Sequence, residues 1–375
     1  MTPIRILHVD SERSWRGGER QVLELMRRQR AMGDEPHLAA PESSALFHRA
    51  AGEGFAAHGA SMRGTWDVAS ALRIASITRA IRPHIVHWHA ARAHALGAIA
   101  ALFARGPKRV LSRRVDFRVR GSLGSRVLYS LPVDAIVAIS DGVRNALLES
   151  GVPGGAIRVI PSGIDLAPFG GPFDRNATRA RMGIRPEQVV AIQVAALAPH
   201  KSQTTLLQAA ARLRESAPRL VIWIAGEGDL RDKLAEEHAR LNLGAQVRFL
   251  GFRDDIPDLL RAADLFVLSS YLEGLGTSVL DAMAAGLPVV ATRVGGVPEI
   301  VKDDETGLLV PPRDSGALAQ AMARLADDPG MRERLGSNGR SLARDFDADR
   351  TASRTRELYL EVLGLGQPGE PPWSH

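Results

Sequence analysis

Two carboxylates that flank a pair of glycines are the residues of this sequence best placed to do chemistry. They are Glu273 and Asp281, eight positions apart in the segment SSYLEGLGTSVLDAMAAGLPVVAT (Ser269–Thr292). One apolar run ends just before the loop and another closes the segment. This pattern predicts a strand, a loop that carries Glu273, a helix over Ser278–Ala285 that carries Asp281, and a second strand.

The start of this predicted helix, opened by Gly276 and Thr277, could bind a diphosphate. A helix start offers unpaired N–H groups and the positive end of the helix dipole, and glycine lets the backbone approach a ligand closely. Glu273 could accept hydrogen bonds from hydroxyls, and Asp281, just over one turn into the helix, could do the same. Two such acids beside a phosphate cradle describe a nucleotide-sugar site. The alternative interpretation is a tight turn with two solvent-exposed acids.

The elements that must position these acids predict a doubly wound α/β fold. Short apolar runs alternate with helical patterns, which indicates parallel sheets covered on both faces. Ligands of such sheets bind at the carboxyl ends of the strands. The expected strands are Ile4–Val9, His84–Trp88, Arg109–Ser112, Ala135–Ser140 and Ile157–Ser162, followed by Val189–Ala195, Leu220–Gly226, Val247–Gly251, Leu265–Ser270 and Pro288–Thr292.

The interruption in this strand series predicts two domains. A chain of 375 residues exceeds one ordinary core. The strands stop after Pro161 and restart at Val189, with a stretch rich in glycine and proline between them. We therefore expect Rossmann-like domains over residues 1–168 and 169–349, a cleft between them, and a flexible tail over 365–375.

Composition narrows the class of protein. Hydrophobic content of 45% and charged content of 24% are typical of a soluble globular protein. The absence of cysteine excludes disulfides and thiolate metal sites. No apolar run approaches the ~20 residues of a transmembrane helix, and the N-terminus shows no secretory pattern. We therefore expect a cytoplasmic protein.

A basic cluster holds much of the net charge of +6. It comprises Arg105, Lys108, Arg109, Arg113, Arg114, Arg118, Arg120 and Arg126, opposed by Asp116. Such a cluster suits the phosphates of a lipid surface or of a phosphorylated acceptor, and the alternative is a merely solvated surface. No aromatic residues alternate with the charges, so nucleic acid is not the expected partner. We expect peripheral contact of Arg105–Arg126 with the inner, anionic face of a membrane.

Two further motifs follow strands of the first domain. In SWRGGERQVLEL (Ser14–Leu25), Gly17 and Gly18 open a helix, but the dinucleotide fingerprint G-x-G-x-x-G is absent, which counts against a dehydrogenase. In HIVHWHA, His87 and His89 point to the same side of a strand. The sequence shows no third ligand nearby, so no metal site is predicted.

The chain resembles the retaining GT-B glycosyltransferases of family 4 over nearly its whole length. The segment from Ser269 to Thr292 matches the family's E-x7-E motif, with Asp281 where glutamate is usual. Further matches are VGGVPEIV (Val294–Val301), TGLLVPPRD (Thr306–Asp314), VIPSGID (Val159–Asp165) and AISDGVRNALLESGVP (Ala138–Pro153). The resemblance implies a GT-B fold, in which a C-terminal helix near 350–364 packs back on the first domain.

The resemblance also implies roles for residues that bind the donor. Glu273 would contact hydroxyls of the donor sugar, and Asp281 would contact the ribose with a reach shorter by one methylene. The diphosphate would lie on the backbone of Gly274, Leu275, Gly276 and Thr277. In VAALAPHKSQ (Val194–Gln203), Lys201 matches a lysine that binds the diphosphate, but Ala196 stands where an arginine is usual. His200 or an arginine of the other domain is the expected substitute.

On the acceptor side the resemblance implies a second group of residues. Gly17 and Gly18 would face the donor phosphate, and Arg16 and Glu19 border their loop. His87 and His89 would line the acceptor side. Relatives carry a histidine near the reacting sugar after the next strand, and Arg113 or Arg114 takes its place here.

Together these implications describe a metal-independent enzyme without cofactors. It would move a sugar from a nucleoside diphosphate sugar, with UDP favoured, to a hydroxyl of a glycan or lipid-linked acceptor. Lipopolysaccharide or another envelope polysaccharide is the expected product. The alternatives are a nucleotide-sugar epimerase and a non-catalytic nucleotide-sugar binder. The D-x-D pattern of DFDAD (Asp345–Asp349) is interpreted as a surface turn and helix cap.

Overall fold

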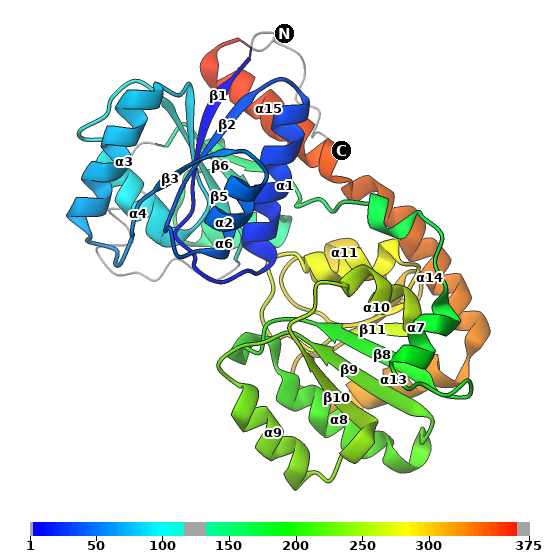
Figure 1. Cartoon of the computed structure of the whole chain (residues 1–375). Helices are drawn as coiled ribbons and strands as arrows, with labels where there is room; N and C mark the ends of the chain where they lie inside the picture. The colour runs from blue at the N-terminus through cyan, green and yellow to red at the C-terminus, as the bar shows by residue number, and fades with distance from the viewer. Residues whose placement is uncertain (1–2, 116–132, 366–375) are drawn as a thin grey trace. The chain divides into compact units, whose positions relative to one another are not determined.

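The computed structural model describes residues 3–115 and 133–365, and these residues form two compact units (Figure 1). The first unit contains the described residues up to Gly163 together with those from Ala348 onward. The second unit is the continuous segment Ile164–Asp347. The chain thus leaves the first unit, builds the second, and returns to the first with its last helix.

A parallel sheet forms the centre of the first unit. Its described strands lie in the order β3-β2-β1-β4-β5-β6-β7. Their bounds are β1 Arg5–Val9, β2 Glu35–Ala40, β3 Ala56–Gly59, β4 Ile85–Trp88, β5 Lys108–Arg113, β6 Ala135–Ala138 and β7 Ile157–Val159. The register between β1 and β4 places His8 beside His87.

Three helices of the first unit begin where short polar side chains cap them. The described helices of this unit are α1 Gly17–Ala31, α2 Ala45–Gly52, α3 Val68–Ile81, α4 Ala91–Ala100, α6 Asp141–Glu149 and α15 Ala348–Leu363. Ser44, Asp67 and Ser140 accept hydrogen bonds from the first turns of α2, α3 and α6, which satisfies N–H groups that have no partner within the helix.

The C-terminal helix α15 is an integral part of the first unit. Leu358 and Tyr359 are buried in the same core cluster as Ile4 and Ile85 of the sheet. Arg356 reaches from α15 to the fully buried Asp34, with Nε and Oδ2 3.0 Å apart. Burying this pair together avoids the cost of an uncompensated charge.

The second unit is built on a parallel sheet of its own. The strand order is β10-β9-β8-β11-β12-β13. The strands are β8 Val189–Val194, β9 Leu220–Ala225, β10 Val247–Gly251, β11 Leu265–Leu268, β12 Val289–Thr292 and β13 Gly307–Val310. The helices are α7 Arg175–Arg181, α8 Gln203–Ser216, α9 Arg231–Arg240, α10 Ile256–Ala262, α11 Thr277–Ala284, α12 Val297–Ile300, α13 Ser315–Asp327 and α14 Pro329–Ala343.

Both sheets confirm the predicted doubly wound class, although three strands were not expected. These are β2, β3 and β13. The strands β3 and β13 each lie at the edge of a sheet, and β2 lies next to β3. No helix among residues 3–115 and 133–365 is long and apolar enough to cross a bilayer. The DFDAD segment supplies a 3₁₀ turn and the start of α15, where Asp349 pairs with Arg28 of α1 at 3.0 Å.

Candidate functional site

The glycine-rich loop between β11 and α11 forms the centre of the candidate site in the second unit. Gly276 caps α11 with φ of 90°, a left-handed conformation that favours glycine. The helix begins at Thr277, so the N–H groups of its first residues lie at the end of this loop, and the phosphate cradle stays a prediction. Gly274 and Leu275 are buried beneath it.

Lys201 and Glu273, 72 positions apart, meet beside this loop. Lys201 Nζ lies 2.5 Å from Glu273 Oε2, and the side chains are only 17% and 13% exposed. Ser270 Oγ donates to the same carboxylate oxygen at 3.1 Å. The hydroxyl of Ser269 fixes the lysine backbone by donating to its carbonyl at 2.9 Å. The structure therefore brings together the two charged residues that the sequence singled out.

Asp281 lies one turn into α11 and is 3% exposed. Glu273 is bonded to Lys201, so the alternative of two solvent-exposed acids is wrong. Burying a carboxylate without polar partners costs several kcal/mol. Both acids are therefore poorly explained as residues without a specific role.

The loop that carries Ala196 packs too closely against the end of β9 to be rearranged freely. A Cβ on Gly226 would lie 2.0 Å from the carbonyl oxygen of Ala195, and one on Gly228 would lie 2.4 Å from that of Leu197. Gln203 Nε2 donates to the Ala196 carbonyl at 2.9 Å. The short side chain of Ala196 thus lies in a fixed loop, and Lys201 at its end supplies a cation.

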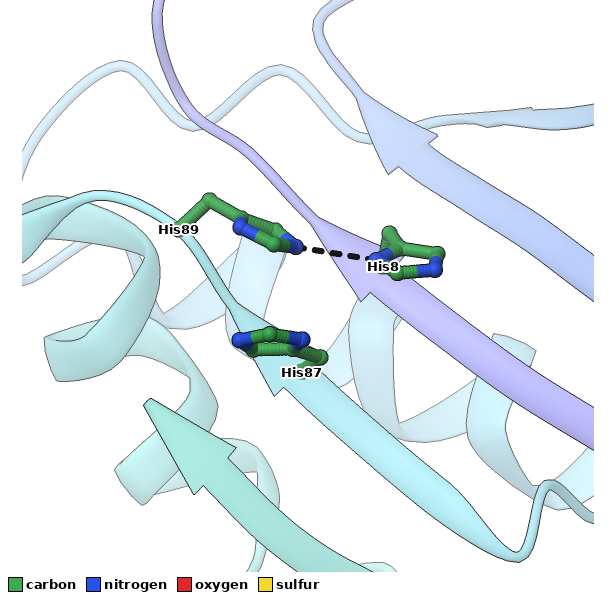
Figure 2. Close-up of side chains that lie close together, drawn as sticks. All are labelled: His8, His87 and His89. Atoms are coloured by element: carbon green, nitrogen blue, oxygen red, sulfur yellow. Dashed lines mark hydrogen bonds between the residues drawn. The ribbon is translucent and has the colours of Figure 1, made fainter. Parts of the chain in front are cut away.

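In the first unit a cluster of three buried histidines lies at the carboxyl ends of β1 and β4 (Figure 2). His8 Nδ1 is 2.9 Å from His89 Nε2, and the rings of His87 and His89 are centred 4.1 Å apart. The expectation that no third histidine lies near His87 and His89 is wrong, because the parallel register of β1 on β4 brings His8 beside them.

Polar neighbours occupy the remaining ring nitrogens of this cluster. His87 contacts the Tyr359 hydroxyl through Nδ1 at 2.6 Å and Ser112 Oγ through Nε2 at 2.8 Å. Burial lowers the pKa of His8 to about 4 and those of His87 and His89 well below the usual 6.5. The histidines are therefore neutral. The absence of a metal stays a prediction, and the ring nitrogens engaged by protein groups, together with the nearby Arg114, are observations that favour it.

The directions of these hydrogen bonds follow from Arg114. A guanidinium only donates, so His89 Nδ1, 3.5 Å from Arg114 Nη2, is the accepting nitrogen. His89 then donates from Nε2 to His8 Nδ1, and His8 donates from Nε2 to Gln29 Oε1 at 2.7 Å. The amide nitrogen of Gln29 donates to the Tyr359 hydroxyl at 3.4 Å. A single chain of hydrogen bonds, which begins at residues of α1 and α15, therefore fixes the tautomer of His89.

Arg114, rather than Arg113, is the arginine that faces the histidines. Its Nη1 donates to Ser162 Oγ at 3.2 Å, and its Nε is shielded from solvent with no hydrogen-bond partner in the described part of the chain. Arg113 instead donates from Nε to the Val115 carbonyl at 3.1 Å. Ser162 and His89 thus hold the guanidinium of Arg114, and each of its Nη nitrogens keeps one further N–H.

The basic cluster is not the uniform surface that the sequence suggested. Arg114 points inward, and Lys108 pairs with Asp134 at 2.9 Å, an acid that the sequence analysis did not count. Three further members, Arg118, Arg120 and Arg126, and the opposing Asp116 lie outside the described residues.

The first glycine-rich loop lies next to Arg114. A Cβ on Gly18 would be 3.9 Å from Arg114 Cδ, and α1 begins at Gly17. Glu19 is buried and its Oε2 accepts from the Arg16 N–H at 2.8 Å, so it caps α1. The exposed Arg16 is the more accessible of the two residues that were expected to border this loop.

Sequence reasoning missed several residues of this group. Asp10, directly after β1, is buried, and burial followed by the charge of Glu19 raises its pKa to about 7. Gln29 and Tyr359 complete the hydrogen-bond chain from helices α1 and α15. An acid and a histidine at the end of the first strand, HVD, were a local signal, whereas Tyr359 had none.

Comparison with known proteins places the chain in a family. The model for Glycosyltransferase Family 4 matches residues 15–168, and the model for Glycosyl transferases group 1 matches residues 174–342. EpsD of Bacillus subtilis (strain 168), a glycosyltransferase by name, is 32% identical over 296 residues, which are 75% of this chain and 77% of EpsD. This chain is a family 4 glycosyltransferase.

Solved structures confirm the GT-B fold of this glycosyltransferase. Anabaena HepE, solved in complex with UDP-glucose, aligns with a TM-score of 0.86 at 23% identity over 96% of this chain and all of that one. WaaG, a glycosyltransferase involved in lipopolysaccharide biosynthesis, aligns with a TM-score of 0.72 at 15% identity over 94% of this chain and 99% of that one.

Other relatives match over part of their length. The D-inositol 3-phosphate glycosyltransferase of Streptomyces bingchenggensis (strain BCW-1) is 34% identical over 218 residues, 55% of this chain. The aligned region spans about half, 48%, of that relative.

Proposed function

We propose that this glycosyltransferase takes its sugar from a nucleoside diphosphate sugar, with a UDP-sugar favoured, and transfers it to a hydroxyl with retention. The observation that carries the proposal is the Lys201–Glu273 pair beside the N-terminus of α11. This arrangement combines a cation and free N–H groups for a diphosphate with a carboxylate for sugar hydroxyls. The HepE structures, which hold UDP and UDP-glucose, support the same class of donor.

The donor would lie over the glycine-rich loop of the second unit. The N–H groups from Gly274 to Thr277 and the ammonium of Lys201 would hold the diphosphate. Glu273 would accept hydrogen bonds from the sugar, and Asp281 would accept them from the ribose. Because aspartate is one methylene shorter than the usual glutamate, a bridging water would serve the ribose contact.

The configuration at the anomeric carbon would be retained because the acceptor oxygen attacks from the same face that the diphosphate leaves. The bond between the anomeric carbon and the diphosphate oxygen breaks, the acceptor oxygen bonds to the same carbon, and the diphosphate oxygen takes the acceptor proton. Lys201 and the α11 N-terminus would stabilise the charge that develops on the diphosphate, without a metal. The alanine at 196 removes one cation that relatives use, which predicts a slower enzyme unless another cation replaces it.

The acceptor would bind the first unit, at the carboxyl ends of β1, β4 and β5. The N–H groups of the half-buried Arg114 that Ser162 and His89 do not use would donate to an acceptor oxygen, and His89 would hold the guanidinium in place. We further propose a glycan or lipid-linked acceptor of envelope polysaccharide synthesis, handled at an anionic membrane. The WaaG likeness and the basic residues from Arg105 to Arg114 support this assignment.

Donor binding and turnover test the proposal directly. A calorimetric panel of UDP, GDP, ADP and their sugars should show tightest binding for one nucleotide, and Glu273→Gln should retain that nucleotide while losing sugar transfer. The matched control is Glu236→Gln, an exposed acid of α9 in the same unit. Transfer by Glu273→Gln at the rate of the control would refute the assignment. Conversion of the donor sugar without an acceptor would instead favour an epimerase, and binding without any release of nucleotide would favour a non-catalytic binder.

A further inference from the structure

A hollow with three arginines in its lining lies in the first unit, away from the histidine cluster. Its volume is about 430 Å³, and it opens at the carboxyl ends of β2 and β3. Its lining includes Arg13 after β1, Arg63 after β3 and Arg73 on α3. His89 and Arg114 follow β4 and β5 at the same edge of the same parallel sheet. The hollow is therefore on the ligand-binding edge of the unit.

The three arginines of this hollow carry charge that the protein does not neutralise by ion pairing. In residues 3–115 and 133–365, none of them lies within ion-pair distance of a carboxylate. Backbone carbonyls hold two of them in place, because Arg13 Nη2 donates to Ser61 O at 3.4 Å and Arg73 Nε donates to Gly59 O at 3.2 Å. These bonds leave the other guanidinium N–H groups available to a ligand.

Two acids near the hollow do not cancel this charge. Glu42 also lines the hollow, which leaves three cations against one carboxylate. Asp67 caps α3 and does not line the hollow, and counting its charge as well still leaves three cations against two carboxylates. Its Oδ1 accepts from Ser70 N–H at 3.0 Å and its Oδ2 accepts from Arg63 N–H at 3.0 Å. The hollow therefore keeps a net positive charge that suits a dianion.

Exposed apolar side chains stand beside the arginines. Trp66 is 78% exposed in the loop before α3, and Val68 and Leu72, one helical turn apart, are 54% and 44% exposed. Tryptophan beside arginine is typical of protein surfaces that meet lipid headgroups. An anion bound in this hollow could thus carry an acyl or prenyl chain across Trp66.

We propose that this hollow binds a phosphate group carried by the acceptor, as a phosphate monoester or diester. The inference rests on the proposed transfer to an acceptor hydroxyl and names the chemistry of that acceptor. Three forked guanidiniums match phosphate oxygens with charge-assisted hydrogen bonds. The phosphate would hold the acceptor at β2 and β3 while its hydroxyl extends along the sheet edge towards Arg114.

Titration with inorganic phosphate tests the hollow. The titration is carried out on the full chain with saturating UDP, so that the proposed donor site is already filled, and with chloride at matched ionic strength as the reference. Wild type should bind phosphate above the chloride reference. Arg63→Ala and Arg73→Ala should each weaken binding about tenfold, the loss expected for one charge-assisted hydrogen bond. Arg79→Ala is the matched control, because it removes an exposed arginine of the same helix outside the hollow.

The outcomes separate this inference from the donor assignment. The phosphate site is refuted if phosphate binds no more tightly than chloride, or if neither arginine variant weakens phosphate binding. UDP binding can persist in either case. Absence of UDP binding in wild type refutes the donor assignment. In that case the phosphate titration without UDP still tests whether the arginines of the hollow bind phosphate.

Vesicles identify the source of the phosphate. Sedimentation with phosphatidylcholine vesicles containing phosphatidic acid, weakened by both Arg63→Ala and Trp66→Ser, supports a lipid-linked phosphate. Phosphate binding that depends on the arginines, without sedimentation, supports a soluble phosphorylated acceptor.

Discussion

At the residue scale, the ion pair between Lys201 and Glu273 decides how the two acids of the glycine-rich loop are understood. Glu273 faces an ammonium and a hydroxyl, whereas Asp281 lies within the helix. Oε2 of Glu273 already accepts hydrogen bonds from the Lys201 ammonium and the Ser270 hydroxyl, so this carboxylate is fixed in place as an acceptor. The two acids are therefore better explained as ligand-holding groups than as an acid–base pair.

Removing the lysine separates the two tasks of this pair. Lys201→Met should lower kcat/KM for transfer by ~10²–10³, since it deletes the charge that would stabilise the departing diphosphate. Binding of the free nucleotide should fall much less. Steady-state kinetics and calorimetry measure the two effects. Lys233→Met, an exposed lysine of α9, is the control. Equal kinetics for the two variants would contradict the role of Lys201.

The chain of hydrogen bonds around His89 makes a spectroscopic prediction. His89 should be neutral and protonated on Nε2, as the donor at Arg114 requires. Gln29→Leu removes the acceptor for His8 and should shift the His89 population towards the Nδ1–H tautomer, with a loss of about 1–3 kcal/mol of stability for the unsatisfied groups. Long-range ¹H–¹⁵N NMR of the imidazoles measures this. An Nδ1–H tautomer in wild type would show that the bond directions are wrong.

At this scale, sequence reasoning succeeded where chemistry is local and failed where it is assembled from distant segments. Glu273 and Lys201 each stand in a continuous motif, so each could be singled out, but their ion pair joins segments 72 positions apart and was not predicted. His8, Gln29 and Tyr359 come from β1, α1 and α15, and only strand register and helix packing bring them together. The choice between Arg113 and Arg114 likewise needed the direction of each side chain at the end of β5.

At the element scale, the contact between α4 and β4 is tight enough to predict whether a substitution raises or lowers the free energy of unfolding. Gly97 lies on α4 against Trp88, and a Cβ there would be 2.3 Å from Trp88 Cε2. Helix propensity alone favours Gly97→Ala by about 1 kcal/mol, whereas overpacking costs about 1–3 kcal/mol. We expect a net loss of stability.

Denaturant unfolding of Gly97→Ala against Gly52→Ala checks this prediction. Gly52 lies in α2 and a Cβ there meets nothing within 4 Å, so its substitution should be neutral or slightly stabilising. A gain in stability for Gly97→Ala would mean that α4 moves to accommodate the methyl group.

Apolar content explains why β2 and β3 were missed, although it does not explain β13, which reads GLLV. The predicted strands were near-continuous apolar runs, and all of them are present, most of them shorter by a residue or two. The strands β2 (EPHLAA) and β3 (AAHG) carry alanine, histidine and glycine, which give little strand signal. Pairing with β1 and with each other, rather than intrinsic preference, makes them strands.

At the scale of the whole molecule, the buried histidines predict an acid-sensitive first unit. Their pKa values are lowered on folding, to about 4 for His8, so their stabilising contribution is complete above about 6.5 and is lost as the pH falls towards 4. The contribution of Asp10 to stability changes with pH in the opposite direction. Its pKa is raised to about 7, so its contribution is present at low pH and is lost as the pH rises through 7.

Two substitutions should therefore change the pH dependence in opposite directions. The unfolding free energy of the first unit should fall between pH 6.5 and 5, by up to about 1.4 kcal/mol per pH unit for each proton taken up. His8→Asn should flatten this slope, and Asp10→Asn should steepen it. Hydrogen exchange of β1 and β4 amides across this range isolates the first unit. A slope that neither variant changes would contradict the buried, neutral state of His8 and the raised pKa of Asp10.

The return of the chain to its first unit has a consequence for biosynthesis. The ribosome makes the sheet of the first unit early, but Leu358 and Tyr359, which fill its core, are made almost last. The second unit is continuous in sequence and can complete its folding while the first still waits for α15. The half of the enzyme synthesised first is thus finished last. A premature stop codon between Ala348 and Leu358 would leave the first unit with an open core and an incomplete histidine chain, even though the second unit was made in full.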